Sequence, residues 1–268
     1  MLRDITLGQF FPGKTPIHRL DPRTKLILLF VYMAALFCAK WFVSYALAMA
    51  FLVFATALAR IPLKSMTRGL KPMLIFMILT GVLNLFYTKG GTLLFSWKII
   101  HIYSKGVETA ILMILRIMML ICGTFLLTYT TSPIALTDAL ERLLSPLKKI
   151  RVPVHELAMM MSIALRFIPT LIEETDKIMS AQKARGADFE TGSLIRRAKA
   201  LIPILVPLFV SAFRRADELA TAMECRCYHG GEGRTRMKVL RFSYRDAVAF
   251  LAGALLLAGV IVLRRFGL

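Results

Sequence analysis

The stretch LILLFVYMAALFCAKWFVSYALAMAFLVFATALA occupies residues 26–59 and contains a single charged residue, Lys40. About 20 apolar residues cross the hydrocarbon core of a bilayer, so this stretch is too long for one crossing. Leu26–Ala39 and Trp41–Ala59 therefore predict two successive membrane-spanning helices, each extending somewhat beyond its apolar run. This pattern indicates an all-α, polytopic membrane protein.

Three more apolar runs continue the pattern, at Met73–Phe86, Gly106–Tyr129 and Ala247–Leu263. The whole sequence is 57% hydrophobic with a net charge of +19, whereas soluble domains are usually about 45–50% apolar. About five spans are thus expected. Arg116 lies inside the fourth, where a charge is costly and usually faces protein or water.

The basic residues are distributed unevenly about these spans. The tail before Leu26, the loop after the second span and the segment from Thr130 to Asp246 together hold 28 of the 35 Lys and Arg residues. Lysine and arginine accumulate on the cytoplasmic side, so we expect a cytoplasmic N-terminus and a C-terminus on the opposite side of the cell membrane. Anionic lipid headgroups explain this charge better than nucleic acid, which is not expected as a partner.

Three regions follow from this pattern. Residues 1–131 form an N-terminal membrane part with about four spans, residues 132–245 a cytoplasmic region, and residues 246–268 the last span. Within the cytoplasmic region, Leu157–Leu165 and Leu201–Phe213 are apolar, but both are short and interrupted or followed by proline. They predict helices that lie along or just below the membrane surface. The alternative is one extra pair of spans, which leaves the orientation of both ends unchanged.

Helix start and stop signals divide the cytoplasmic region further. A short helix is expected over 133–144, followed by a long helix over 153–184 that Gly186 ends. Ser193 is a candidate N-cap for a second long helix, which continues to about residue 227.

The two long helices end in similar stretches, Asp176–Gly186 and Asp217–Cys227, whose arginines lie 41 residues apart. In both, an aspartate precedes the arginine by nine positions, a hydroxyl residue by five and an alanine by four. The central and flanking residues are Ala181, Ala184, Arg185 and Gly186 in the first copy, and Ala222, Cys225, Arg226 and Cys227 in the second.

These arginines allow two interpretations. A cation in the last turn of a helix is favoured by the helix dipole, and most such arginines are solvated caps. An arginine with very small neighbours is also suited to enter a partner's groove, because its planar guanidinium reaches acceptors without steric hindrance from its own backbone.

The sequence offers little sign of nucleotide or metal chemistry. GxxxxGK[ST] is matched once, by GQFFPGKT at residues 8–15, but this stretch leads into the first apolar span and does not connect a strand to a helix as a phosphate loop does. GxGxxG and HExxH patterns are absent, and the four histidines are scattered. Cys38 and Cys122 lie in apolar runs, where cysteine is a small core residue. Cys225, Cys227 and His229 form a C-x-C-x-H fragment, but a fourth zinc ligand is not evident. We therefore expect no catalytic residue, no bound cofactor and no metal site.

The N-terminal stretch HRLDPRTKL, residues 18–26, has the features of a capped membrane helix. Asp21 is suited to the N-cap and Pro22 to the first helical position. Together with SIALRFIP at residues 162–169 and the two arginine stretches, this motif resembles the T component of energy-coupling factor (ECF) transporters, a prokaryotic branch of the ATP-driven importers. The resemblance covers nearly the whole chain.

The resemblance implies a non-catalytic membrane scaffold of the prokaryotic cell membrane. Two ABC-type ATPase subunits bind ATP and receive the arginine-bearing coupling helices, and a small membrane subunit, the S component, binds a vitamin or a metal ion. By position, Arg185 enters one ATPase and Arg226 the other, with the small residues listed above beside them. Members of the family usually carry Ala-Arg-Gly or Ala-Arg-Ser where this chain has Cys225-Arg226-Cys227. Without glycine, residue 227 is not expected to adopt a left-handed backbone, so the helix is predicted to continue to Tyr228 or Gly230.

A stand-alone secondary transporter or channel is the alternative function. Such proteins usually place charged residues or broken helices near the middle of the bilayer. Here only Arg116 is clearly intramembrane, and the one carboxylate within the spans, Glu108, lies at the very start of the fourth.

Overall fold

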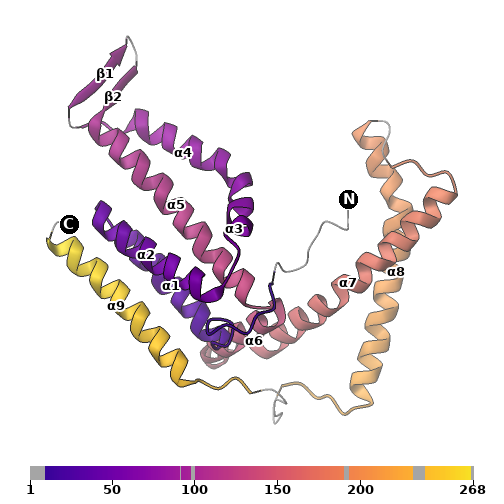
Figure 1. Ribbon diagram of the computed structural model, residues 1–268. Helices are drawn as coiled ribbons and strands as arrows, with labels where there is room; N and C mark the ends of the chain where they lie inside the picture. The colour runs from indigo at the N-terminus through magenta and orange to yellow at the C-terminus, as the bar shows by residue number, and fades with distance from the viewer. Residues whose placement is uncertain (1–9, 91, 98–99, 190–192, 232–238, 267–268) are drawn as a thin grey trace. The chain divides into compact units, whose positions relative to one another are not determined.

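The structure is a computed structural model that describes residues 10–90, 92–97, 100–189, 193–231 and 239–266. The chain divides into two compact units (Figure 1). The bundle unit comprises Gly8–Ala139 and Leu240–Leu268, and the helix-pair unit comprises Leu140–Val239.

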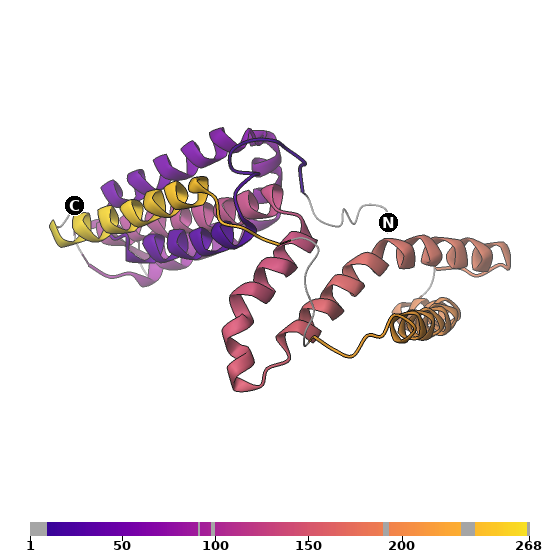
Figure 2. The same ribbon diagram turned by 90° about the horizontal axis from the view of Figure 1, so that it is seen from below.

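The bundle unit consists of membrane-type helices from both ends of the chain. Its first and last long helices, α1 and α9, pack side by side (Figures 1 and 2). Gly253 of α9 makes this approach possible, because a Cβ atom there would lie 2.5 Å from Leu28 Cδ2 of α1. The helices are α1 (Pro22–Cys38), α2 (Phe42–Ala59), α3 (Leu63–Leu70), α4 (Leu74–Tyr87), α5 (Ser104–Thr130) and α9 (Tyr244–Phe266), with a 3-10 turn, η2, at Lys71–Met73.

The core of the bundle unit lies between α1, α2, α5 and α9. Leu36, Tyr45, Met119 and Val260 are almost completely buried there. Large apolar side chains on the outer faces are exposed, as in Phe54 (64%) and Leu255 (64%). Exposed apolar surface over whole helices is expected for a protein whose surroundings are lipid.

Five helices in the described residues are long and apolar enough to cross a membrane. They are Phe42–Ala59, Lys64–Tyr87, Ser104–Thr130, Val154–Ala184 and Tyr244–Phe266. The number agrees with the prediction, but the membership differs. Helix α1 has 17 residues and is not among them, because the chain leaves the helix at Ala39 with an extended backbone. The helix Val154–Ala184, expected at the membrane surface, is among them.

A β-hairpin between α4 and α5 was not predicted. Strands β1 (Leu93–Trp97) and β2 (Ile100–Tyr103) pair antiparallel, with Phe95 opposite Ile102. Their isoleucines and aromatic residues favour strands. The hairpin is the only departure from an all-α architecture in the part of the chain that the structure describes.

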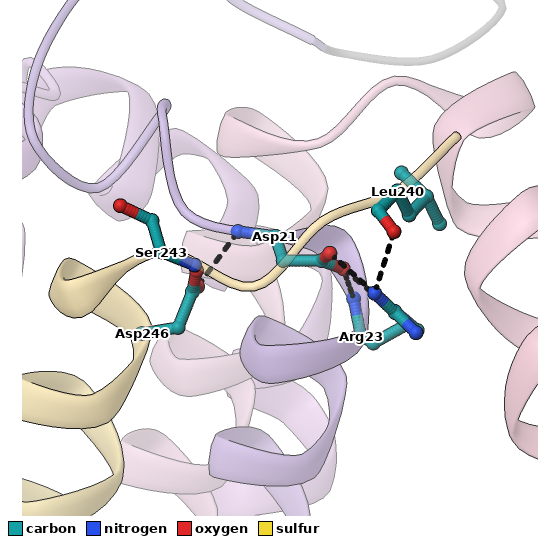
Figure 3. Close-up of polar contacts among 5 residues, drawn as sticks. All are labelled: Asp21, Arg23, Leu240, Ser243 and Asp246. Atoms are coloured by element: carbon teal, nitrogen blue, oxygen red, sulfur yellow. Dashed lines mark hydrogen bonds and ion pairs between the residues drawn. The ribbon is translucent and has the colours of Figure 1, made fainter. Parts of the chain in front are cut away.

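The HRLDPRTKL motif joins the first and last helices of the bundle unit (Figure 3). The Asp21 carboxylate accepts the Arg23 amide at 2.9 Å, which confirms the predicted N-cap, and forms an ion pair with the Arg23 guanidinium at 2.8 Å. Arg23 also donates to the Leu240 carbonyl at 3.2 Å. The Asp246 carboxylate of α9 accepts the Asp21 amide at 2.9 Å and the Ser243 amide at 2.8 Å. The predicted helix cap is therefore also a joint between segments distant in sequence.

Arg116 faces protein, as expected for a charge inside a span. Its Nε donates to the Tyr45 hydroxyl at 2.7 Å and its Nη2 to the Ala39 carbonyl at 3.1 Å. The Ala39 carbonyl follows the C-terminus of α1, where carbonyl groups lack partners within the helix. Arg116 of α5 thus stabilises the turn between α1 and α2.

The helix-pair unit contains the end of α6, from Leu140, and two long helices. Helix α6 spans Pro133–Leu144, and the Ser132 hydroxyl accepts the Ala135 amide as an N-terminal cap. A 3-10 turn, η3, at Ser145–Ile150 leads to α7 (Val154–Ala184), and α8 spans Leu194–Glu224. Helices α7 and α8 cross each other (Figures 1 and 2). Both run without a break through their prolines, Pro169 in α7 and Pro203 and Pro207 in α8.

Candidate functional site

Arg185 lies at the C-terminus of α7, immediately before a residue with left-handed backbone. Gly186 has φ +85. The Gly186 amide donates to the Lys183 carbonyl at 3.0 Å, and the Ala187 amide donates to the Gln182 carbonyl at 3.0 Å. This pair of hydrogen bonds is the Schellman motif, which satisfies carbonyl groups at a helix end.

Arg226 lies at the same kind of helix end, which corrects the prediction for residue 227. Cys227 adopts the left-handed backbone itself, with φ +56, so the helix does not continue to Tyr228 or Gly230. The Cys227 amide donates to the Glu224 carbonyl at 2.8 Å, and the Tyr228 amide donates to the Met223 carbonyl at 3.0 Å. A left-handed conformation costs a residue with a Cβ atom about 1–2 kcal/mol. The two hydrogen bonds of the motif offset this cost.

The repeat extends one turn towards the N-terminus of each helix. The Ser180 hydroxyl donates to the Asp176 carbonyl at 2.7 Å, and the Thr221 hydroxyl donates to the Asp217 carbonyl at 2.9 Å. Each hydroxyl thus lies against its own helix, where it is satisfied by the preceding turn. The sequence repeat therefore corresponds to a repeated local structure.

All eight residues singled out in the sequence are exposed: Ala181, Ala184, Arg185, Gly186, Ala222, Cys225, Arg226 and Cys227. Neither Arg185 nor Arg226 makes a side-chain hydrogen bond or ion pair within the described residues. Both guanidinium groups carry the charge that the negative end of the helix dipole favours. They are open to an external acceptor.

The structure separates the two arginines instead of bringing them together. Gln182 of α7 donates to the Pro203 carbonyl of α8 at 3.4 Å, and Arg215 Nη2 lies 2.9 Å from Glu174 Oε2. The residue nearer the C-terminus of α7 thus contacts the residue nearer the N-terminus of α8, so the two helices are antiparallel. From Pro203 to Arg226 the helix rises roughly 35 Å, at about 1.5 Å per residue. Arg185 and Arg226 thus lie at opposite ends of the pair.

The crossing of α7 and α8 is held by a polar cluster that sequence analysis missed. The Glu174 carboxylate accepts hydrogen bonds from the Ser211 hydroxyl and from Arg215. The Arg215 guanidinium also lies over the Phe167 ring, 5.8 Å from its centroid. The sequence alone does not indicate that Glu174 and Arg215 meet, because it does not determine how α7 and α8 align against each other.

His155 lies in the first turn of α7, at the end of this helix opposite Arg185. Its Nδ1 lies 3.0 Å from Glu141 Oε1, and a Cβ atom added at Gly231 would lie 2.4 Å from the His155 ring. The chain that follows α8 therefore packs against the first turn of α7. Glycine is needed at residue 231 for this close approach.

The C-x-C-x-H fragment gains no further ligand in the structure. Cys225 and Cys227 are free and exposed. Among the residues that the structure describes, no three His, Cys, Asp or Glu side chains are grouped so that they could hold a metal ion.

The chain thus combines helices that can cross a membrane with two long helices, each ending in an exposed arginine. The profile of the CbiQ family, described as "Cobalt transport protein", matches residues 13–237. The chain therefore belongs to this family, and the resemblance to the ECF T component is confirmed.

Curated relatives carry the name "Energy-coupling factor transporter transmembrane protein EcfT". One from Ruminiclostridium cellulolyticum is 55% identical over 92% of this chain and 92% of its own length. One from Thermosediminibacter oceani is 55% identical over 98% of this chain and 99% of its own length. One from Bacillus subtilis is 47% identical over 98% of this chain and its whole length. The names describe transporter components and no enzymatic activity.

Proposed function

We propose that this chain is the energy-coupling scaffold of an ATP-driven importer of the ECF type. It links two ABC-type ATPase subunits, which bind and hydrolyse ATP, to a small membrane subunit that binds the substrate. The chain itself binds no nucleotide. The observation that carries this proposal is the pair of matching helix ends, each presenting one exposed arginine.

The geometry supports one ATPase subunit per arginine. A separation of the order of 35 Å along α8 is far too large for both guanidinium groups to enter one small groove. The local structures around Arg185 and Arg226 match, so each can dock in the same way on an identical or closely similar subunit. Carboxylate or carbonyl acceptors suit the planar guanidinium, which donates parallel hydrogen bonds.

An apolar stripe on α8 supports a membrane-bound partner. Leu205, Phe209 and Phe213 recur every four residues and are 46%, 61% and 67% exposed. Residues at this spacing share one face of a helix. Apolar surface of this extent needs lipid or a partner to cover it. We assign it to the small substrate-binding subunit and the adjoining membrane surface.

The orientation and the substrate class belong to the same proposal. With 28 of the 35 basic residues on one side, we place the N-terminus and the helix-pair unit on the cytoplasmic side, where ATP is available. In this arrangement α7 lies along the membrane surface, although its length and composition would also allow it to cross. The substrate is a micronutrient, either a vitamin or a metal ion. The family description names cobalt, which lies within this class, whereas the names of the relatives state no substrate.

Substitution of the two arginines tests this function. Arg185→Ala and Arg226→Ala should each weaken binding of one ATPase subunit by about tenfold to a hundredfold, because hydrogen bonds to charged groups contribute about 1.5–3 kcal/mol. The double variant should abolish ATP-driven uptake in proteoliposomes. Arg214→Ala is the matched control, since Arg214 is an exposed arginine of α8 outside the repeat.

Two results would contradict the proposal. Uptake by the double variant at the rate of the control would remove the coupling role of the arginines. Substrate uptake by the chain alone, in liposomes without any ATPase, would favour a stand-alone transporter or channel.

A further inference from the structure

A cleft of about 330 Å³ lies within the bundle unit between α1, α2, α5 and α9. Its walls are almost entirely apolar and include Leu28, Phe51, Leu127 and Val248. Cavities of this size bind small molecules in other proteins. The docking arginines belong to the other unit, so this cleft is separate from the site proposed for the ATPases.

Apart from Tyr32, the polar residues of the cleft gather at one end. Lys25 is in the first turn of α1, Thr130 is the last residue of α5, and Tyr244 and Arg245 begin α9. The lining then continues along α9 to Ala252, about 12 Å further at a rise of about 1.5 Å per residue. The cleft thus has a charged mouth and an apolar interior. An occupant that fits it must have a polar head and an apolar chain.

Lys25 provides a buried cation at this mouth. Its ammonium donates to the Thr130 carbonyl at 2.8 Å and to the His18 carbonyl at 3.3 Å, and the residue is 7% exposed. An ammonium has three N–H donors. Both of these acceptors are neutral carbonyl groups, so one donor remains for a negatively charged group.

Arg245 provides a second cation, and its charge is not neutralised by a carboxylate in the described residues. Its Nε lies 3.3 Å from the Tyr244 hydroxyl. The neighbouring carboxylates are already engaged: Asp246 accepts two backbone amides, and Asp21 pairs with Arg23. Arg23, Lys25 and Arg245 outnumber the carboxylates Asp21 and Asp246 by one, so these five side chains carry one net positive charge. An anion at the mouth would complement it.

The interior of the cleft has one unpaired polar group. Tyr32 is 4% exposed, lines the cleft, and has a buried hydroxyl without a hydrogen-bond partner among the described residues. Its ring packs on Gly123, where an added Cβ atom would lie 2.9 Å from Tyr32 Cε1. A buried donor usually has an acceptor. The Tyr32 hydroxyl has almost no accessible surface, so it does not face an occupant of the cleft and does not select one.

We propose that this cleft binds one anionic phospholipid, with its acyl chain along the apolar walls and its phosphate beside Arg245 and Lys25. A phospholipid combines the negative head and the apolar chain that the cleft requires. Lipid also surrounds this unit at high concentration: Val248, which lines the cleft, is 61% exposed on α9. The proposal depends on the membrane location of the chain and is independent of ATPase docking.

Lipid titration of the purified full chain tests the proposal. Native mass spectrometry would count phosphatidylglycerol or phosphatidylcholine bound in detergent, with identical acyl chains in the two lipids. We expect one phosphatidylglycerol per chain, bound at least about tenfold more tightly than phosphatidylcholine. Arg245→Gln should weaken phosphatidylglycerol by about fivefold and reduce this preference, since one cation near a lipid surface contributes roughly that factor.

Matched substitutions distinguish the cleft from general attraction to lipid. Ala252→Phe fills the interior and should remove the bound lipid, whereas Ala254→Phe changes an exposed position of the same helix and should not. Arg241→Gln removes an exposed charge outside the cleft and should also leave binding unchanged. If Ala252→Phe does not fold, the comparison of Arg245→Gln with Arg241→Gln decides.

Four results would overturn the inference. The first is equal affinity of the unsubstituted chain for the two lipids. The second is an equal loss in Arg241→Gln and Arg245→Gln. The third is lipid binding by a folded Ala252→Phe chain at the original strength. The fourth is displacement of the lipid by inorganic phosphate alone, which would indicate a site for a free anion.

Discussion

Removal of the Asp246 carboxylate should destabilise the bundle unit strongly. Asp246 is 2% exposed and accepts the amides of Asp21 and Ser243 (Figure 3). In Asp246→Ala, water replaces the partner of the Ser243 amide, because Ser243 is exposed. The Asp21 amide belongs to a residue that is only 6% exposed and loses its partner in a buried place. Loss of the two hydrogen bonds should lower the free energy of unfolding by about 2–4 kcal/mol.

Denaturant titration of the full chain in detergent micelles would measure this loss. Circular dichroism would follow the helices, and the two tryptophans would report local unfolding. Total stabilities of about 5–15 kcal/mol make a shift of this size easy to detect. Asp246→Asn should cost about half as much, because its amide oxygen still accepts one hydrogen bond while its NH2 group opposes the second donor.

Glu108→Ala is the matched control. Glu108 lies on α5, and its carboxylate makes no hydrogen bond or ion pair within the described residues. An unfolding midpoint of Asp246→Ala equal to that of Glu108→Ala would refute the reasoning. It would mean that the Asp21 amide finds another acceptor without Asp246.

Three further changes test other parts of the structure. Cys227→Gly should stabilise the last turn of α8 by up to about 1 kcal/mol, and Gly186→Ala should destabilise that of α7 by a similar amount. Amide hydrogen exchange would measure both changes. A change in the same direction for the two variants would contradict the expectation. Arg116→Met should cost about 2 kcal/mol in detergent unfolding because the Tyr45 hydroxyl loses its partner, and Tyr45→Phe in the same chain should recover part of the loss; additive effects would exclude this coupling. Burial lowers the pKa of His18 below its ordinary 6.5, so the unfolded chain binds the proton more readily and stability should fall as the pH drops below about 6.5; His18→Gln should flatten that slope.

The helix boundaries near strong local signals could be predicted from the sequence. Asp21 and Pro22 determine the start of α1 through a side-chain cap and a fixed φ angle, and Ser193 caps α8 in the same way. These signals act within a few residues. They are independent of how the rest of the chain folds, so the residues alone are sufficient to locate them.

The helix end at Cys227 shows where residue preferences fail. Left-handed backbone is unfavourable for cysteine, so the sequence favoured a longer helix. The amides of Cys227 and Tyr228 nevertheless find carbonyl acceptors only if the chain turns there. A preference of about 1–2 kcal/mol is easily exceeded by two hydrogen bonds and the packing that follows them.

The contacts between distant segments could not be predicted. Glu174 and Arg215 meet only because α7 and α8 are antiparallel at one register, and Lys25 meets the Thr130 carbonyl only because α5 ends beside the start of α1. Periodicity within a helix determines which residues share a face and does not determine which helix covers it. The docking roles of Arg185 and Arg226 stay predictions, since they depend on surfaces of other proteins.

The hydrogen bond from the Asp21 amide to Asp246 joins residues 225 positions apart. A ribosome makes α1 among the first segments of this chain and α9 last, so α1 stays in the membrane without this neighbour throughout synthesis. Contacts of such long range form late, because the whole intervening loop must be closed first. A chain that stops before Tyr244 leaves the Asp21 amide unpaired and one side of α1 uncovered. Complete packing of α1 therefore has to wait until α9 has been made.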